Sequence, residues 1–179
     1  YARKVLPKNV SPLEVVSSKL RLFKSKEEIA CLENAVAVTA SSFFETARFI
    51  TAGVTENFIA ATLEYWIRAQ GGELSFNTIV AGGKNASVLH FSPTDRELKK
   101  GELALLDFGG SIDGYCADVT RTVPVGGELV SQKLIDIYHI VLEAQEAAIS
   151  SVKSGVLLSD LHKSAATVII KGLMAIKLL

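Results

Sequence analysis

The 179 residues carry 19 basic and 19 acidic side chains, so the formal net charge is zero and neither nucleic acid nor an acidic membrane is an expected partner. Their number suffices for one domain with a hydrophobic core, and 49% of them are hydrophobic. Two cysteines are too few for a disulfide framework and, with no apolar stretch of about 20 residues to span a membrane, they favour reduced thiols in the cytoplasm.

Two helices are predicted in the first half of the chain. Ser25 and Glu28 have the spacing of a capping box, after which apolar side chains recur at helical spacing until Gly53. The second helix opens at Thr55 and closes at the glycine pair 71–72. The recurring apolar positions of the first helix are Ile29, Leu32, Ala35, Val36, Phe43 and Phe44.

Strands are predicted in the middle of the chain. Short runs at 76–80 and 88–91 are β-like in composition, and the apolar stretch 103–106 favours a further strand. Another strand is expected over 115–123, after the turn sequence Asp113–Gly114, which is a strong hairpin signal. The last two strands are therefore predicted to form an antiparallel hairpin.

Two more helices are predicted after the hairpin. One starts at Ser131 and continues to about Ser150, and the other starts at Ser159 and continues to the C-terminus. In the first of them the residues expected to face inward are Leu134, Ile137, Tyr138, Val141 and Leu142. Residues 1–19 hold two prolines and no clear period, so a linker or the tail of an upstream domain is expected there. The order of elements indicates an α+β fold with an antiparallel sheet.

Two carboxylates in the hairpin, Asp107 and Asp118, need a reason, because aspartate is depleted in strands. If residues 112–113 form the loop, the two aspartates lie directly opposite one another. If residues 113–114 form it, Asp107 faces Thr120 and Asp118 is its diagonal neighbour. Both registers place the two carboxylates on one face of the ladder, because side chains alternate with period 2.

Adjacent carboxylates repel one another and raise one another's pKa, whereas divalent cations between them reverse the effect. Two metal ions about 3.5–4 Å apart would fit between opposed carboxylates. The alternative is a solvated hairpin tip on which the two acids are neighbours by chance. The apolar residues that lead up to Asp107 favour metal ligation over that alternative.

Three stretches of the sequence resemble the pita-bread metallopeptidases, and among them the Xaa-Pro aminopeptidase branch. The stretches are SFNTIVAGGKNASVLHF, GELALLDFGG and GYCADVTRTVPVGG. The resemblance implies the first half of a pita-bread fold, an antiparallel sheet with flanking helices. It makes residues 20–179 the N-terminal half of the catalytic domain and residues 1–19 a linker or the tail of a missing N-terminal domain. By the same resemblance, Asp107 chelates one metal ion and Asp118 bridges two.

The resemblance also gives His90 a role at the substrate, either in binding it or in stabilising the transition state. From its apolar neighbours alone, His90 would be a core histidine. Thr120 is two positions from Asp118 on the same side, and we expect it to hydrogen-bond a ligating carboxylate or to be an ordinary strand residue. Arg121 is expected to form a structural ion pair. His139 and His162 are expected on helix surfaces.

The family completes its metal site with one histidine and two glutamates from the second half of the domain, and no such motif follows Val123 here. We therefore expect residues 1–179 alone to bind no metal, to lack peptidase activity and to self-associate or depend on a chaperone. Whether the chain is a fragment or a truncated product stays open. The DFG triplet at 107–109 also occurs in protein kinases, but no Gly-rich loop, Val-Ala-Ile-Lys strand or His-Arg-Asp loop accompanies it.

For the complete protein, the resemblance implies hydrolysis of the bond between an N-terminal residue and a following proline. It implies two divalent ions, manganese first and cobalt or zinc as alternatives, a peptide substrate with proline second, and a homo-oligomer. Two alternatives stay open, which are an Xaa-Pro dipeptidase and a non-catalytic pita-bread module that binds peptides.

Overall fold

The computed structural model describes residues 12–127 and 131–179. Its helices are α1 (Leu13–Leu22), α2 (Lys26–Ala47), α3 (Glu56–Ala69), α4 (Gln132–Ser150) and α5 (Leu158–Ala175), and a 3₁₀ helix covers Gly83–Ser87. Its strands are β1 (Glu73–Leu74), β2 (Ile79–Gly82), β3 (Leu103–Phe108), β4 (Gly110–Ile112), β5 (Tyr115–Cys116) and β6 (Val119–Pro124). The chain divides into two compact units, residues 1–125 and 126–179.

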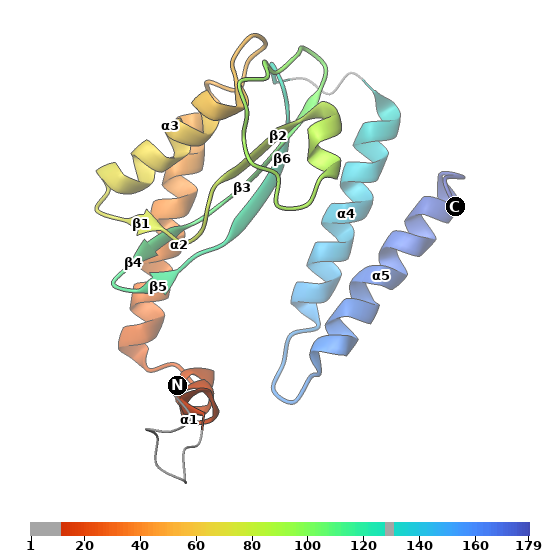
Figure 1. Ribbon diagram of the computed structural model, residues 1–179. Helices are drawn as coiled ribbons and strands as arrows, with labels where there is room; N and C mark the ends of the chain where they lie inside the picture. Colours follow the sequence, from red (N-terminus) through yellow and green to blue (C-terminus); the bar gives the residue numbers. More distant parts are fainter. Residues whose placement is uncertain (1–11, 128–130) are drawn as a thin grey trace, which may run out of the picture. The chain divides into compact units, whose positions relative to one another are not determined.

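Within the described residues of the first unit, the strands form two three-stranded antiparallel sheets, with strand orders β1-β4-β5 and β2-β3-β6. Helix α2 contacts β4 and β5, and α3 contacts β1 and β2, so helices flank the strands (Figure 1). The predicted α+β class with antiparallel sheet and flanking helices is confirmed.

Helix α1 was not predicted from the sequence. It crosses the boundary predicted between residues 19 and 20, while residues 1–11 lie outside the described part of the chain. The assignment of 1–19 to a linker or an upstream domain stays a prediction. Among residues 12–127 and 131–179, no helix combines the length and the apolar composition that crossing a bilayer demands.

Helix α2 begins as predicted, with Ser25 and Glu28 bonded reciprocally in a capping box. The Ser25 N–H donates to a Glu28 carboxylate oxygen at 2.6 Å, and the Glu28 N–H donates to the Ser25 hydroxyl at 3.3 Å. The helix ends at Ala47 rather than near Gly53. Of the apolar positions that recur along the helix, Ala35 is buried, whereas Val36 and Phe44 are exposed. The buried residues are Ala35, Val38, Thr39, Ser42 and Thr46.

The small buried face of α2 lets the backbone of β4 approach the helix closely. The Gly110 N–H donates to the Thr39 hydroxyl at 2.9 Å, and that hydroxyl donates to the Ala35 carbonyl at 2.8 Å. The helical spacing of large apolar residues could not predict this contact, because polar and small side chains make the contact.

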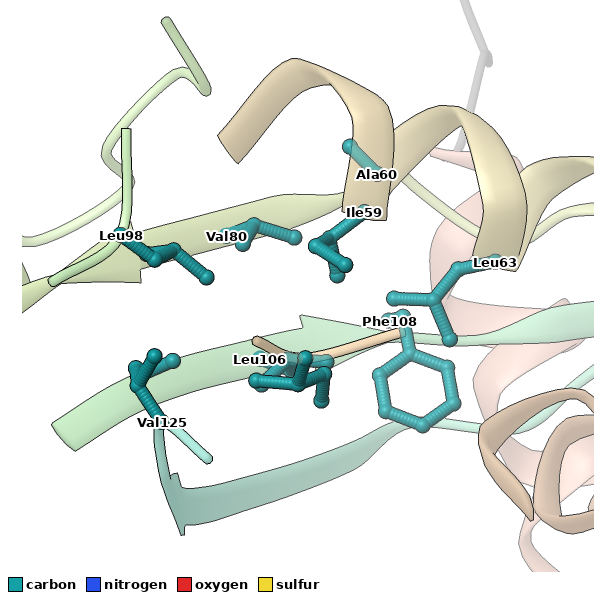
Figure 2. Close-up of a cluster of buried hydrophobic side chains, with 10 residues drawn as sticks. Ile59, Ala60, Leu63, Val80, Leu98, Leu106, Phe108 and Val125 are labelled. Carbon is teal, nitrogen blue, oxygen red and sulfur yellow. The ribbon is translucent and has the colours of Figure 1, made fainter. Parts of the chain in front are cut away.

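The hydrophobic core of the first unit lies between α3 and the β2-β3-β6 sheet. Figure 2 shows its main members, which are Ile59, Ala60, Leu63, Val80, Leu98, Leu106, Phe108 and Val125. Helix α3 starts at Glu56 after the N-cap Thr55, as predicted, and the Thr55 hydroxyl accepts from the Phe58 N–H at 3.2 Å. The cap fixes where the helix begins and therefore which of its residues meet the sheet.

The predicted hairpin forms, and its loop is Asp113–Gly114, because Ile112 pairs with Tyr115. Asp107 accordingly pairs with Thr120, which is the second of the two registers allowed by the sequence. The single strand predicted over 115–123 is instead divided into β5 and β6. The division occurs where β3 and β4 pass from one sheet to the other, so that each end of the hairpin pairs with a different neighbour.

The strand predicted over 88–91 does not form. The chain there is irregular, Val88 and Leu89 are 55% and 90% exposed, and His90 has a φ of 52°. The strand composition fails as a signal because no strand among residues 12–127 pairs with these apolar residues, and β propensity depends on such packing. The first short strand is also displaced, from the predicted 76–80 to Ile79–Gly82.

Glu56 is fully buried at the first position of α3, and its carboxylate accepts hydrogen bonds from Gly82, Asn85 and Thr94. Burial of this carboxylate opposes its ionisation and raises its pKa. The hydrogen bonds from the three residues outweigh burial, so the pKa of Glu56 lies below its ordinary value of 4.5. The charged form is therefore part of the folded structure.

We expect stability to fall as the pH is lowered through the Glu56 pKa. The folded-state pKa is depressed, so the ionised carboxylate stabilises the fold above the ordinary value of 4.5, and this contribution is lost below it. Glu56→Gln leaves buried donors poorly paired, which costs about 1–3 kcal/mol near neutral pH. Urea unfolding of the protein and the variant at about pH 7 and about pH 4 should show a smaller difference at the lower pH. An equal difference at both pH values would contradict the assignment.

The second unit is a helical hairpin in which α4 packs on α5. Helix α4 starts after Ser131 and ends at Ser150, as predicted, whereas α5 starts at Leu158, one residue before the predicted Ser159, and ends at Ala175. A Cβ at Gly172 would lie 2.6 Å from the side chain of Ile140, so the glycine allows close packing. The predicted inward face of α4 is wrong for Tyr138, Val141 and Leu142, which are exposed, while Ile140 and Ala144 are buried.

Candidate metal centre

Asp107 and Asp118 line one cavity of about 840 Å³ in the first unit. Asp107 lies on β3, and Asp118 lies directly before β6. The remaining walls come from α3, from residues 76–79 and from residues 90–93. The structure thus brings together the two carboxylates that the hairpin pattern singled out.

The two carboxylates are electrostatically coupled. Desolvation raises the pKa of Asp118, and the negative charge of Asp107 and side-chain hydrogen bonding with Asp107 raise it further. Two neighbouring carboxylates are destabilised when both are ionised. A divalent cation between them would remove the repulsion.

The donor set fits a hard divalent ion. Carboxylate oxygens are the ligands preferred by magnesium and manganese, and both aspartates line one cavity. Among residues 12–127 and 131–179, however, no three His, Cys, Asp or Glu side chains are grouped so that they could hold a metal ion. The residues present therefore fit part of a metal site.

Gly109 lies between β3 and β4, and no other residue fits at its position. A Cβ there would lie 1.9 Å from the Ala117 carbonyl oxygen and 3.1 Å from the ring of Phe76. The close approach of the two backbones sets the path of the chain into Asp118. The Ala117 N–H donates to the Gly110 carbonyl at 2.9 Å, which fixes the same crossing.

Thr120 contacts the carboxylate pair as expected from its place on the strand. Its hydroxyl donates to an Asp107 carboxylate oxygen at 2.9 Å. Such a hydrogen bond fixes which oxygen of Asp107 is turned toward the cavity. A role for Thr120 in metal binding stays a proposal.

His90 lies in the wall of the cavity, and it is exposed rather than part of the core. This placement is contrary to the core histidine suggested by its apolar neighbours, and it leaves the imidazole accessible to a ligand. Phe91 and Pro93 line the same wall. The catalytic role of His90 stays a proposal.

Arg121, on β6, is not among the residues that line the cavity. Arg121 donates to the Thr120 carbonyl at 2.8 Å, and none of the salt bridges found in the described residues includes it, so the predicted ion pair does not form there. His139 and His162 are exposed on α4 and α5, which confirms their placement on helix surfaces.

The sequence did not reveal the α3 side of the cavity. Asn57, Ala60, Ala61 and Glu64 line it at helical spacing, so one face of α3 is turned toward the site. The sequence did contain a signal for this face, because the polar residues Asn57 and Glu64 lie seven positions apart on an otherwise apolar side of the helix. Thr78 was also missed, and its buried hydroxyl has no hydrogen-bond partner within the described part of the chain.

A pair of adjacent carboxylates facing a cavity is typical of metal-dependent hydrolases. The profile of metallopeptidase family M24 matches residues 30–177. The chain belongs to this family.

Several relatives carry the name of an Xaa-Pro peptidase. An Xaa-Pro dipeptidase of Lactobacillus helveticus is 40% identical, with 96% of this chain and 47% of the relative covered. An Xaa-Pro aminopeptidase of Escherichia coli is 32% identical, with 92% and 37% covered. The structure of Pseudomonas aeruginosa aminopeptidase PepP has a TM-score of 0.92 at 34% identity and covers 99% of this chain and 41% of that one. The chain spans about half the length of the curated relatives it matches, and the pita-bread fold expected for it is confirmed.

Proposed function

We propose that the full-length protein containing these residues is an Xaa-Pro aminopeptidase, which hydrolyses the bond between an N-terminal residue and a following proline. The observation that carries the proposal is the pair Asp107 and Asp118, adjacent on one cavity of an M24 metallopeptidase fold. Relatives named Xaa-Pro aminopeptidase and Xaa-Pro dipeptidase support the proline preference.

Asp107 and Asp118 would hold two divalent ions, manganese first and cobalt or zinc as alternatives. When bound, such ions lower the pKa of a water molecule so that it can attack a carbonyl at neutral pH. Thr120 holds the Asp107 carboxylate in a fixed orientation through its 2.9 Å hydrogen bond. His90 would donate a hydrogen bond to the oxygen on which negative charge develops during attack.

The cavity wall suits a proline side chain. Phe76, Phe91 and Pro93 contribute apolar surface against which a pyrrolidine ring can pack. Proline also lacks an N–H and has a fixed φ, so a site that recognises it needs shape rather than a hydrogen bond to its nitrogen. With the proline ring packed on this wall, the amino terminus of the peptide would point toward the carboxylates of Asp107 and Asp118.

Further proposals concern the state of the protein. We expect a cytoplasmic location, supported by two free cysteines, Cys31 and Cys116, and a homo-oligomer. We expect residues 1–179 alone to bind no metal and to lack turnover, because two carboxylates would leave each ion mostly coordinated by water. A self-associated or chaperone-dependent state of these residues is expected because of their high apolar content.

The proposal is tested by supplying the purified full-length protein and manganese with three peptides: an Xaa-Pro tripeptide, the matching Xaa-Ala tripeptide and an Xaa-Pro dipeptide. We expect release of the first residue from the Xaa-Pro tripeptide and little from the Xaa-Ala tripeptide. Cleavage of the dipeptide alone would favour the Xaa-Pro dipeptidase, which the 40% identical relative also suggests. Binding without cleavage in manganese, cobalt or zinc would favour the non-catalytic module.

Thr120→Val tests the hydroxyl at the carboxylate pair, because valine has nearly the same shape and no donor. Loss of an outer partner of a metal ligand typically weakens metal binding by about 10–100-fold, and we expect a manganese affinity lowered within that range. Thr122→Val, on the same strand, is the matched control and should change the affinity little. Calorimetric titration of the full-length protein measures both. Equal affinities for the two variants would show that the Thr120 hydroxyl is an ordinary strand feature.

A further inference from the structure

The Glu56 carboxylate joins two separate parts of the chain. One of its oxygens accepts from the Gly82 N–H at 2.9 Å and from the Asn85 side-chain amide at 2.9 Å. The other accepts from the Thr94 N–H at 3.2 Å and from the Thr94 hydroxyl at 2.7 Å. One side chain therefore holds both ends of the stretch between Asn85 and Thr94.

That stretch, residues 86–93 (the His90 segment), forms one wall of the cavity through residues 90–93. Its own residues give it little support. Val88 and Leu89 are exposed, and no hydrogen bond found in the described part of the chain ties residues 89–93 to another element. The position of the segment consequently depends on how its two ends are held.

His90 has a left-handed backbone conformation, with a φ of 52°. Such a conformation is uncommon for a residue other than glycine and persists where the surrounding structure determines it. It turns the chain in the middle of the His90 segment and places the imidazole in the cavity wall. If the ends of the segment were not held, nothing would require His90 to keep this positive φ.

A simpler role for Glu56 is the favourable interaction of an acidic side chain with the amino end of α3. The hydrogen bonds argue against this as its main role. All four that the carboxylate accepts come from Gly82, Asn85 and Thr94, outside the helix. Two backbone hydrogen bonds also join the start of α3 to this part of the chain. The Glu56 N–H donates to the Arg96 carbonyl, and the Asn57 N–H donates to the Thr94 carbonyl. The first residues of α3 are thus hydrogen-bonded to residues 94–96, which directly follow the His90 segment.

We propose that Glu56 is a positioning residue for His90: by fastening both ends of the His90 segment, it holds the imidazole in the cavity that contains Asp107 and Asp118. The catalytic part of this proposal rests on the role proposed above for His90. Glu56 itself touches no cavity surface and acts only through the segment.

The test compares four variants of the full-length protein: Glu56→Gln, Thr94→Val, His90→Ala and the double variant Glu56→Gln/His90→Ala. Glu33→Gln, at an exposed glutamate of α2, is the control for loss of a charge. Hydrogen exchange measured by mass spectrometry reports on residues 86–93, and steady-state kinetics with an Xaa-Pro peptide gives kcat and KM. Calorimetry gives the manganese affinity.

We expect Glu56→Gln to speed exchange in the His90 segment and to lower kcat roughly 10- to 100-fold, since small misplacements of a catalytic group have effects of this size. The manganese affinity should change by less than about twofold, because Glu56 contacts neither aspartate, and Thr94→Val should act in the same direction more weakly. In the His90→Ala background, Glu56→Gln should lower kcat no further. A purely structural role would instead give additive losses and a reduced manganese affinity.

Unchanged exchange in both Glu56→Gln and Thr94→Val would overturn the proposal, and so would losses in kcat that add in the double variant. If Glu56→Gln does not fold, the exchange and kinetics of Thr94→Val decide. If the unmodified protein cleaves no Xaa-Pro peptide, the proposed function fails, while the exchange data still show whether Glu56 holds the segment. If His90→Ala keeps full turnover, the role of His90 fails and, with it, the catalytic part of this proposal.

Discussion

Replacing Asp118 by Asn is expected to lower manganese-dependent hydrolysis of an Xaa-Pro peptide by the full-length protein more than about a hundredfold, beyond the loss typical of outer partners of a metal site. The amide keeps the shape of the side chain but removes the negative charge on which a divalent ion depends. The fold should stay largely intact, because partial burial and the Asp107 charge already raise the pKa of Asp118 and make its ionised form unfavourable. Steady-state turnover and circular dichroism measure the two effects separately.

Asp113→Asn is the matched control for this experiment. Asp113 is an exposed residue of the hairpin turn with a φ of 52°, a conformation that asparagine adopts readily. The Asp113→Asn variant makes the same chemical change in the same hairpin, and we expect it to keep nearly full turnover. An Asp118→Asn protein that hydrolyses the peptide at the normal rate, with metal removed by a chelator, would show that the ligand assignment is wrong.

Gly109→Ala is expected to destabilise the protein by about 3 kcal/mol, at the upper end of the range for overpacking. The new Cβ would lie 1.9 Å from the Ala117 carbonyl oxygen, so a backbone group has to move rather than a flexible side chain. The displaced peptide directly precedes Asp118. We therefore expect a lower manganese affinity together with the loss in the free energy of unfolding.

Gly114→Ala serves as the control for Gly109→Ala. Gly114 also lies in the hairpin, but a Cβ added there would meet no atom within 4 Å, and only its φ of 80° is unfavourable for alanine. Its cost should be about 1–2 kcal/mol, with the manganese affinity unchanged. Chemical denaturation and calorimetric titration of both variants test the difference. Equal losses of stability, or an unaltered manganese affinity in Gly109→Ala, would contradict the proposed link between the crossing and the carboxylates.

The sequence predicted the hairpin and its carboxylate pair well, for a local reason. Asp113–Gly114 determines the turn, and the alternation of side chains then places Asp107 and Asp118 on one face in either register. The choice between the registers needed the structure, which pairs Asp107 with Thr120. Helix starts at Ser25 and Thr55 were predicted for a similarly local reason, the capping chemistry of their first turn, whereas Ser131 precedes α4 without a side-chain capping hydrogen bond.

Predictions failed where the outcome depends on distant residues. The irregular path of 88–91 is held by Glu56, more than thirty positions earlier in the chain, and a strand pattern carries no information about such an anchor. The buried face of α2 consists largely of small and polar residues that pack near β4, so the apolar positions recurring along the helix, among them the exposed Val36 and Phe44, do not mark that face. The α3 side of the cavity was missed because the residues of α3 that line it can be identified only when the position of the facing strand is known.

Anomalous diffraction at the manganese edge, from crystals of the full-length protein soaked with manganese, tests the metal site most directly. The proposed function predicts anomalous peaks within bonding distance of the carboxylates of Asp107 and Asp118, with one peak between the two side chains. Manganese peaks elsewhere in the protein, with the two carboxylates free of metal, would contradict it.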